Sequence, residues 1–207
     1  MSPRKAPALH GTDLSLREHL IATAERLIAE RGTTGLTVRA IAREAGVADG
    51  VLYNHFADKE ELLALAVRAH LRTVGQALGE LPRPGDGSVR SNLRAHFLYG
   101  VAFHKAVLPA FAGLIGQPRV LDAFNASGVS GEDWRDQLRE YLRGEVELGR
   151  LSPGAKVDAV VAMIVGVCHE TVLTGLLYGA SDASELSGEF VDDLVSTVLE
   201  GIGPAGM

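Results

Sequence analysis

Apolar residues recur every three or four positions along most of the chain, which is the spacing of amphipathic helices. The first run extends from Leu16 to Ile28 and stops at Arg31-Gly32. It follows Ser15-x-x-Glu18, a capping box typical of a helix N-terminus. The pattern therefore predicts an all-α fold that opens with a helix from about residue 15 to 31.

Two short helical patterns follow, hinged at a glycine. Thr37 is a suitable N-cap for a helix over residues 38–45, whose apolar positions fall on one face. Gly46 stands where a helix commonly ends in a left-handed residue. A second short helix is expected from Asp49 to Phe56, with Leu52 on the core side. The outward residues are then short, polar or aromatic, which suits entry into a DNA major groove.

A longer apolar stripe runs from Lys59 to Leu81 and ends at Pro82-Arg83-Pro84-Gly85. A helix of this length spans roughly 35 Å at about 1.5 Å per residue. We expect it to connect an N-terminal domain to a second one. Residues 82–87 would form the loop at the boundary, and a new helix follows from about Val89.

The middle of the chain is interrupted by proline and glycine. Pro109, Gly113, Gly116, Pro118 and residues 128–131 separate short apolar segments, which predicts short helices around a pocket. Asp136 to Leu148 is a clearer amphipathic helix. Its many charges are interpreted as a solvated outer face.

Two apolar helices are predicted at the C-terminal end. Residues 157–177 are almost continuously apolar, long enough to raise the question of a membrane span. Asp158, His169 and Glu170 argue against one, because charged groups are costly in hydrocarbon. With a second helix over residues 187–202, this helix suggests a two-fold interface in which two chains form a four-helix bundle.

Composition describes a globular chain in a reducing compartment. The chain has 207 residues, 46% hydrophobic and 22% charged, enough for a buried core. Its one cysteine, Cys168, excludes an intramolecular disulfide and is expected to be a buried thiol. Residues 1–13 form a Pro/Gly-bearing tail without the apolar run of a signal peptide, so a cytoplasmic location is expected.

For DNA binding, the distribution of charge along the chain matters more than the net charge of −6. Up to residue 81 there are ten Lys or Arg and ten Asp or Glu, so the acidic excess lies entirely in the remainder. A neutral N-terminal part can still bind phosphate through a few well-placed cations, with modest, salt-dependent nonspecific affinity. This balance favours a sequence-specific DNA reader over a general DNA-coating protein.

The N-terminal segment resembles the TetR family of bacterial transcriptional regulators over roughly residues 16–65. The resemblance rests on Gly35-Leu36-Thr37-Val38-Arg39-Ala40-Ile41-Ala42, Ala45-Gly46-Val47, Leu52-Tyr53-Asn54-His55-Phe56 and Lys59-Glu60-Glu61-Leu62-Leu63. It implies an all-α homodimer with a three-helix helix-turn-helix domain and a larger C-terminal ligand-binding and dimerisation domain. The expected domains are residues 1–58 for DNA binding, 59–81 for the connecting helix and 82–207 for ligand and partner.

The resemblance also implies which residues contact DNA. Arg39 would donate to a guanine edge or a phosphate, or is an ordinary surface arginine. Asn54 would contact adenine and Val51 a thymine methyl. His55 is a candidate clamp on the DNA backbone, or a packing residue beside Phe56. The full set of candidates is Thr37, Arg39, Asp49, Gly50, Val51, Tyr53, Asn54, His55 and Lys59.

Two positions depart from the family pattern where the second short helix begins. Ala48 stands where a capping serine or threonine is common, so a side-chain contact is missing there. Asp49 stands where a basic or neutral residue is common, and its carboxylate would be repelled by phosphate. It would be tolerated if it accepted a bond from cytosine or capped the helix, and capping is the favoured interpretation.

The family's C-terminal domain usually binds a small molecule, and aromatic residues are the candidates to line such a site. An apolar effector is expected, with His104 and His169 as possible polar contacts, although most aromatic residues in such a domain are simply core and such histidines are more often core or surface residues. The candidates are Phe97, Phe103, His104, Phe111, Phe124, Trp134, Met163, His169 and Tyr178.

No catalytic or metal-binding motif is visible. The sequence lacks His-Glu-x-x-His, Cys-x-x-Cys, Gly-x-Ser-x-Gly and a Walker-type phosphate loop, so neither an enzyme nor a cofactor is expected. We expect a repressor that binds an inverted-repeat operator and is released by a small ligand. An activator of the same family, or a nonspecific nucleoid or scaffolding protein, is the alternative.

Overall fold

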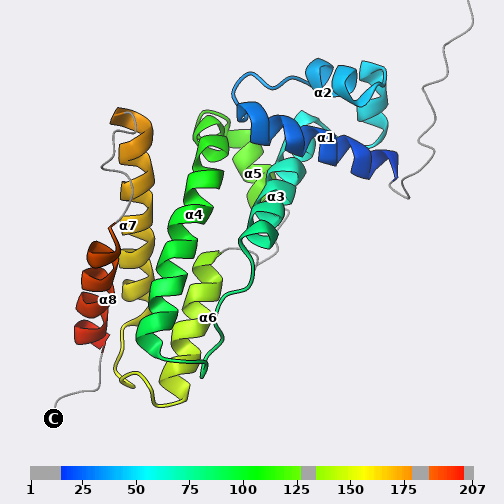
Figure 1. Cartoon of the computed structure of the whole chain (residues 1–207). Helices are drawn as coiled ribbons and strands as arrows, with labels where there is room; N and C mark the ends of the chain where they lie inside the picture. Colours follow the sequence, from blue (N-terminus) through cyan, green and yellow to red (C-terminus); the bar gives the residue numbers. More distant parts are fainter. Residues whose placement is uncertain (1–14, 127–133, 179–186, 203–207) are drawn as a thin grey trace, which may run out of the picture. The chain divides into compact units, whose positions relative to one another are not determined.

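A computed structural model of the chain describes residues 15–126, 134–178 and 187–202. All regular elements in these ranges are helices, which confirms the predicted all-α fold. The predicted tail over residues 1–13 and the segment 128–131 lie outside the described residues. In chain order the elements are α1 (Leu16–Arg31), α2 (Val38–Ala45), the 3-10 helix η1 (Asp49–Asn54), α3 (Lys59–Leu78), α4 (Val89–Ile115), α5 (Pro118–Ala126), α6 (Trp134–Glu147), α7 (Val157–Tyr178) and α8 (Gly188–Ile202), labelled in Figure 1.

The helices belong to two compact units. The first comprises Met1–Thr73 and Pro109–Gly128, and the second comprises Val74–Leu108 and Val129–Met207. Helices α3 and α4 therefore each contribute residues to both units. The predicted boundaries after residues 58 and 81 concern functional domains and stay a prediction.

The first unit is built on the three predicted N-terminal helices. Its α1 begins at the predicted capping box, in which Ser15 and Glu18 bond each other's backbone N–H groups. The end of α4 and helix α5 complete this core, and the Thr33 hydroxyl donates to the buried Ala110 carbonyl at 2.8 Å. Core residues from both parts of the chain are Leu20, Ala24, Leu27, Ile28, Ile41, Leu52, Phe56, Leu63, Val67, Ala110, Leu114 and Val120.

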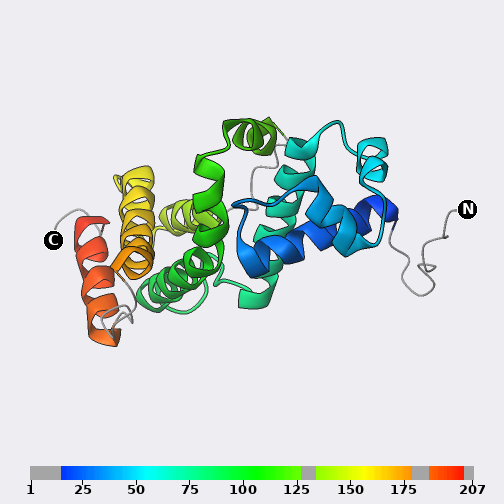
Figure 2. The same ribbon diagram turned by 90° about the horizontal axis from the view of Figure 1, so that it is seen from above.

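The second unit is a bundle in which α4, α6, α7 and α8 run side by side (Figures 1 and 2). Gly100 of α4 allows the indole of Trp134 to approach closely, since a Cβ at this position would lie 2.3 Å from the ring. Cys168 is buried as predicted, and burial raises the pKa of its thiol to about 12. This thiol is therefore uncharged at neutral pH.

The sequence misplaced the helix boundaries at two positions. Pro109 does not interrupt its helix, because α4 continues from Val89 to Ile115. The lost backbone bond is offset by burial of Ala110 and Leu114 in the first unit. Helix α3 ends at Leu78 and not at Leu81, because Gly79 adopts φ +86°, outside the helical region.

Helix α6 exposes most of its charged side chains as predicted, namely Arg135, Glu140, Arg143 and Glu147, and one carboxylate is the exception. Glu145 is fully buried. Its Oε2 lies 3.1 Å from Nε of Arg150, and its Oε1 accepts from the backbone N–H of Gly85 at 3.2 Å. The carboxylate therefore ties the loop between α3 and α4 to α6.

His96 and Tyr141 are buried beside this ion pair, with their ring centroids 4.5 Å apart. Burial lowers the pKa of His96 to about 4, and the Pro82 carbonyl opposes that shift only in part. Burial also raises the pKa of Tyr141 well above its usual value. Both rings are therefore neutral at physiological pH.

Helices α4 and α7 are long and apolar enough to cross a membrane by length and composition alone. Core helices of globular proteins pass the same test. Helix α7 packs against α6, and α4 is joined to α8 by a bond from Arg90 Nη1 to Ser196 Oγ at 2.7 Å. Of the most apolar stretch of each helix, 28% is buried in α4 and 33% in α7, so much of their apolar surface is exposed in the single chain.

Candidate nucleic-acid interface and apolar pocket

The helix-turn-helix segment is fixed by local backbone chemistry. The Thr37 hydroxyl accepts from the Ala40 N–H at 3.1 Å, which confirms its predicted role as N-cap of α2. Gly46 ends α2 in the left-handed region, φ +71° and ψ +28°, as expected. The Val47 N–H then donates to the Ala42 carbonyl at 3.0 Å, so the turn into η1 is held by main-chain bonds.

The second short helix is a 3-10 helix over residues 49–54, tighter and shorter than predicted. Leu52 and Phe56 are buried, as expected. Tyr53 is 61% exposed, and Asp49, Gly50 and Asn54 are also exposed, whereas Val51 and His55 are half-buried. The segment thus presents polar and aromatic side chains to solvent.

Asp49 does not cap this helix, which corrects the favoured interpretation. The N-cap position is Ala48, and no side chain bonds the first turn. The Asp49 carboxylate instead lies 3.3 Å from Nε of Arg39 on α2, with the two side chains 53% and 89% exposed. The predicted DNA-contacting arginine is therefore paired within the chain.

The segment after η1 is anchored by Arg17 of α1. The Arg17 guanidinium lies over the Phe56 ring, 4.9 Å from its centroid, and donates from Nε to the His55 carbonyl at 3.3 Å. Its Nη2 donates to Glu61 Oε1 at 2.8 Å, and Glu61 Oε2 accepts from the Ala57 N–H at 2.7 Å. These bonds hold the backbone between His55 and the half-buried Lys59, the first residue of α3.

Sequence reasoning did not single out Arg17 or Glu61. Their contacts join residues 38 to 44 positions apart, and no local pattern reports such pairs. A glutamate at position 61 is also explained by its place in the first turn of a helix, where negative charge is favourable, so nothing in the sequence suggested a partner for it. Only the packing of α1 against the start of α3 reveals that the two charges meet.

The predicted ligand-lining residues fall into separate groups. Four of them form one aromatic cluster in the second unit, where the His104 ring centroid lies 4.4 Å from that of His169, 5.4 Å from Trp134 and 5.9 Å from Phe103. Phe111 and Phe124 pack edge to face in the first unit and contact its core. Tyr178 is 81% exposed at the end of α7. The structure therefore does not bring the whole set together.

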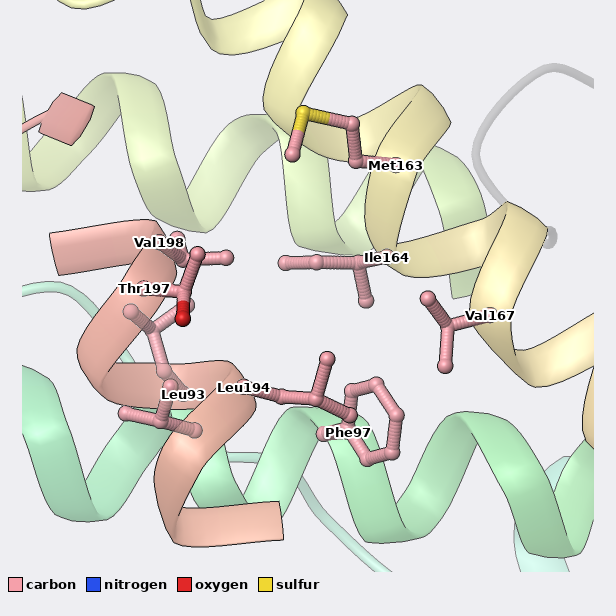
Figure 3. Close-up of a pocket in the computed structure, with 9 residues that line it drawn as sticks. Leu93, Phe97, Met163, Ile164, Val167, Leu194, Thr197 and Val198 are labelled. Carbon is pink, nitrogen blue, oxygen red and sulfur yellow. The ribbon is translucent and has the colours of Figure 1, made fainter. Parts of the chain in front are cut away.

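Phe97 and Met163 line an apolar pocket between α4, α7 and α8 that is partly open to solvent (Figure 3). Sequence reasoning searched for aromatic residues and missed the aliphatic ones that provide most of the wall. The other lining residues are Leu93, Ile164, Val167, Leu194, Val195, Thr197 and Val198.

Comparisons with known proteins agree with this geometry. Residues 20–66 match the family model of bacterial regulatory proteins of the tetR family. The chain is 34% identical over 86 residues to the HTH-type transcriptional repressor NemR of Escherichia coli K12, an alignment that covers 42% of this chain and less than half, 43%, of that repressor.

Two further matches extend beyond the N-terminal domain. A structure of the transcriptional regulator FadR from Bacillus subtilis in complex with stearoyl-CoA superposes with a TM-score of 0.59 at 22% identity, covering 86% of this chain and 97% of FadR. The HTH-type transcriptional repressor KstR2 of Mycobacterium tuberculosis is 46% identical over 159 residues, covering 72% of this chain and 76% of KstR2. From this identity and the family match, the chain belongs to the TetR family of bacterial transcriptional regulators.

Proposed function

We propose that this regulator is a cytoplasmic repressor that binds an inverted-repeat operator as a homodimer and is released by a small apolar ligand. The observation that supports it most is the exposed surface of η1, with Tyr53 and Asn54 beside Arg39 of α2 and Lys59 at the start of α3. DNA contact is assigned to residues 1–58, connection to 59–81, and ligand binding and dimerisation to 82–207.

The proposed DNA contacts are of two kinds, contacts to base edges and contacts to the sugar-phosphate backbone. Asn54 and Val51 would contact base edges, and Arg39 a guanine or a phosphate. Tyr53, His55 and Lys59 would hold the DNA backbone, with Thr37 as a further contact. Gly50 leaves the start of η1 without a side chain, so that a DNA strand can approach closely.

Helices α7 and α8 are proposed as the dimer interface. Large apolar side chains are exposed on α7, where Leu173 is 43% and Leu177 73% exposed, and Phe190 on α8 is 46% exposed. Groups of large apolar side chains that are exposed in the single chain often mark surfaces at which proteins associate. A two-fold dimer would place two η1 segments about 34–36 Å apart, one turn of DNA.

The effector is proposed to be small and apolar. FadR, which shares the fold, is named in complex with stearoyl-CoA, a molecule with a long hydrocarbon chain. A ligand that favours one spacing of the two DNA-binding domains would change operator affinity by roughly 5- to 150-fold. The same DNA contacts would serve an activator, and a nucleoid protein would lack preference for any sequence.

The proposal is tested by selecting bound fragments from genomic DNA and measuring affinity for the selected site. We expect Arg39→Ala and Tyr53→Ala each to weaken operator binding about tenfold or more while the dimer stays folded, because each removes a proposed contact. Gln76→Ala, an exposed polar position late in α3, is the control. Unchanged gel-shift affinity in both variants would contradict the assignment.

A further inference from the structure

The pocket in the second unit has walls made almost entirely of hydrocarbon. Leu93 and Phe97 enter it from α4, Ile164 and Val167 from α7, and Leu194 from α8, and Figure 3 shows these side chains pointing toward a common space. Met163, 57% exposed, lies at its edge. Water in such a space gains few hydrogen bonds, so an apolar molecule would displace it favourably.

The charged residues nearest to these positions in α4 are already paired with α8. Arg90 donates to Ser196, and Nε of Arg94 lies 3.0 Å from Oδ1 of Asp192. Neither arginine lines the pocket. An ionic group buried there would lose its hydration without gaining a counter-charge, which costs several kcal/mol. The lining therefore selects against carboxylates and quaternary ammonium groups as the buried part of a ligand.

Thr197 supplies the single hydroxyl of the lining, and because this residue is exposed, a ligand would meet the hydroxyl at the solvent side of the pocket. Its Oγ1 donates its proton to the Asp193 carbonyl at 2.9 Å. The oxygen can then only accept a further bond. A ligand would satisfy it with a donor such as a hydroxyl group.

We propose that this pocket is the effector site and that it binds an uncharged aliphatic molecule carrying a hydroxyl group. This inference rests on the proposed function and gives it a place and a ligand chemistry. Two of the three helices around the pocket, α7 and α8, are those proposed for the dimer interface. A ligand wedged among α4, α7 and α8 would shift these helices and thereby change how two chains pair.

Binding is measured with the neutral fluorescent probe N-phenylnaphthylamine on the full chain, followed by displacement with hexanol, octanol and decanol. Each added methylene should raise affinity about fourfold until the pocket is filled, because each buries a further CH₂. Decanoate and decyltrimethylammonium should displace the probe at least tenfold more weakly than decanol. Equal displacement by all three would overturn the chemical assignment.

A matched pair of substitutions locates the site. Leu194→Trp fills the pocket, whereas Leu98→Trp makes the same change on α4 outside the lining, at a residue 39% exposed. We expect the first to abolish probe binding and the second to leave it unchanged. Val198→Phe provides a milder filling variant if Leu194→Trp does not fold. Probe binding that survives in a folded filling variant would overturn the location.

Thr197→Val tests the hydroxyl contact with little change of shape. It should lower decanol affinity about fivefold or more and leave unchanged the affinity of decyl methyl ether, which has no hydrogen-bond donor. Equal decanol affinity in the two proteins would contradict the contact. Probe binding that falls as protein concentration rises through dimerisation would show that a second copy fills the pocket, and would also overturn the proposal.

The effect of the ligand on DNA binding is tested by titrating decanol into the complex of the protein with selected operator DNA. We expect operator affinity to fall at least fivefold in the wild type and in Leu98→Trp, but not in Leu194→Trp. Alcohol binding without any change in operator affinity would overturn the effector role and leave DNA binding intact. Absence of any preferred operator would instead contradict the proposed function itself.

Discussion

The carboxylate of Asp49 is an unusual feature of the surface proposed to contact DNA. Asp49 lies at the start of η1 and pairs with Arg39, so it both fixes the direction of the arginine and places negative charge near the expected path of the phosphates. Exposed pairs of this kind contribute little to stability, about 0–1 kcal/mol. We propose that the pair serves specificity, because an oriented arginine would read a guanine edge better than a mobile one.

Asp49→Asn should therefore raise affinity for unrelated DNA several-fold while raising operator affinity less. The loss of negative charge strengthens every phosphate contact, and the untethered Arg39 no longer favours one base. Fluorescence anisotropy at one salt concentration, with operator and scrambled duplexes of equal length, measures both affinities. An equal gain on the two duplexes would mean that Asp49 acts through charge alone.

His96 provides a prediction about stability and pH. Its pKa is about 4 in the folded chain and 6.5 ordinarily, so below about pH 6.5 the unfolded chain takes up a proton that the folded one does not. Stability from this residue is therefore complete above pH 6.5 and falls as pH decreases toward 4.

Between about pH 7.5 and pH 5, the free energy of unfolding of the wild type should fall about 2 kcal/mol more than that of His96→Leu. Urea unfolding at constant protein concentration measures the difference, since dimer stability depends on concentration. Equal pH dependence in the two proteins would show that His96 is accessible to protons in the folded state.

At the scale of elements, the segment from His55 to Lys59 is positioned by α1. Arg17 holds the His55 carbonyl and Glu61 at once, and Glu61 in turn holds the Ala57 N–H. Arg17→Leu should lower operator affinity about tenfold at a temperature where the variant is fully folded. Arg17→Lys should restore it only in part, because an ammonium cannot keep both planar contacts.

Salt dependence separates this positioning role from direct contact with DNA. If Arg17 acts through the backbone of the segment, the slope of log affinity against log salt stays as in the wild type. A slope reduced by about one unit would show a lost phosphate contact instead. A lower melting temperature with unchanged affinity would mean that Arg17 only stabilises the fold.

The elements that the sequence predicted well are those with local signals. The capping box at Ser15 and the αL position of Gly46 each depend on a few neighbouring residues, and both were located correctly. The passage of α4 through Pro109 was not predictable locally, because burial against the first unit outweighs the lost bond. The pocket was not predicted either, because it is formed by aliphatic residues from three helices that are far apart in the sequence.

For the whole molecule, the exposed apolar face of α7 should hold two chains together. Leu173→Glu introduces a carboxylate there and should shift the protein toward monomer, with a matching loss of operator affinity, because two linked DNA-binding domains bind far more tightly than one. Gln76→Glu adds the same charge at an exposed polar position of α3 and should leave the dimer intact. Sedimentation analysis measures the outcome, and a wild type that is monomeric would contradict the interface.

The proposed function depends above all on recognition of a particular DNA sequence by this regulator. The most direct test compares its affinity for a fragment selected from genomic DNA with that for a scrambled duplex of the same length, at one near-physiological salt concentration. We predict binding to the selected fragment that is at least about 10³-fold tighter, as sequence-specific proteins show. Equal affinity for the two duplexes would contradict the account.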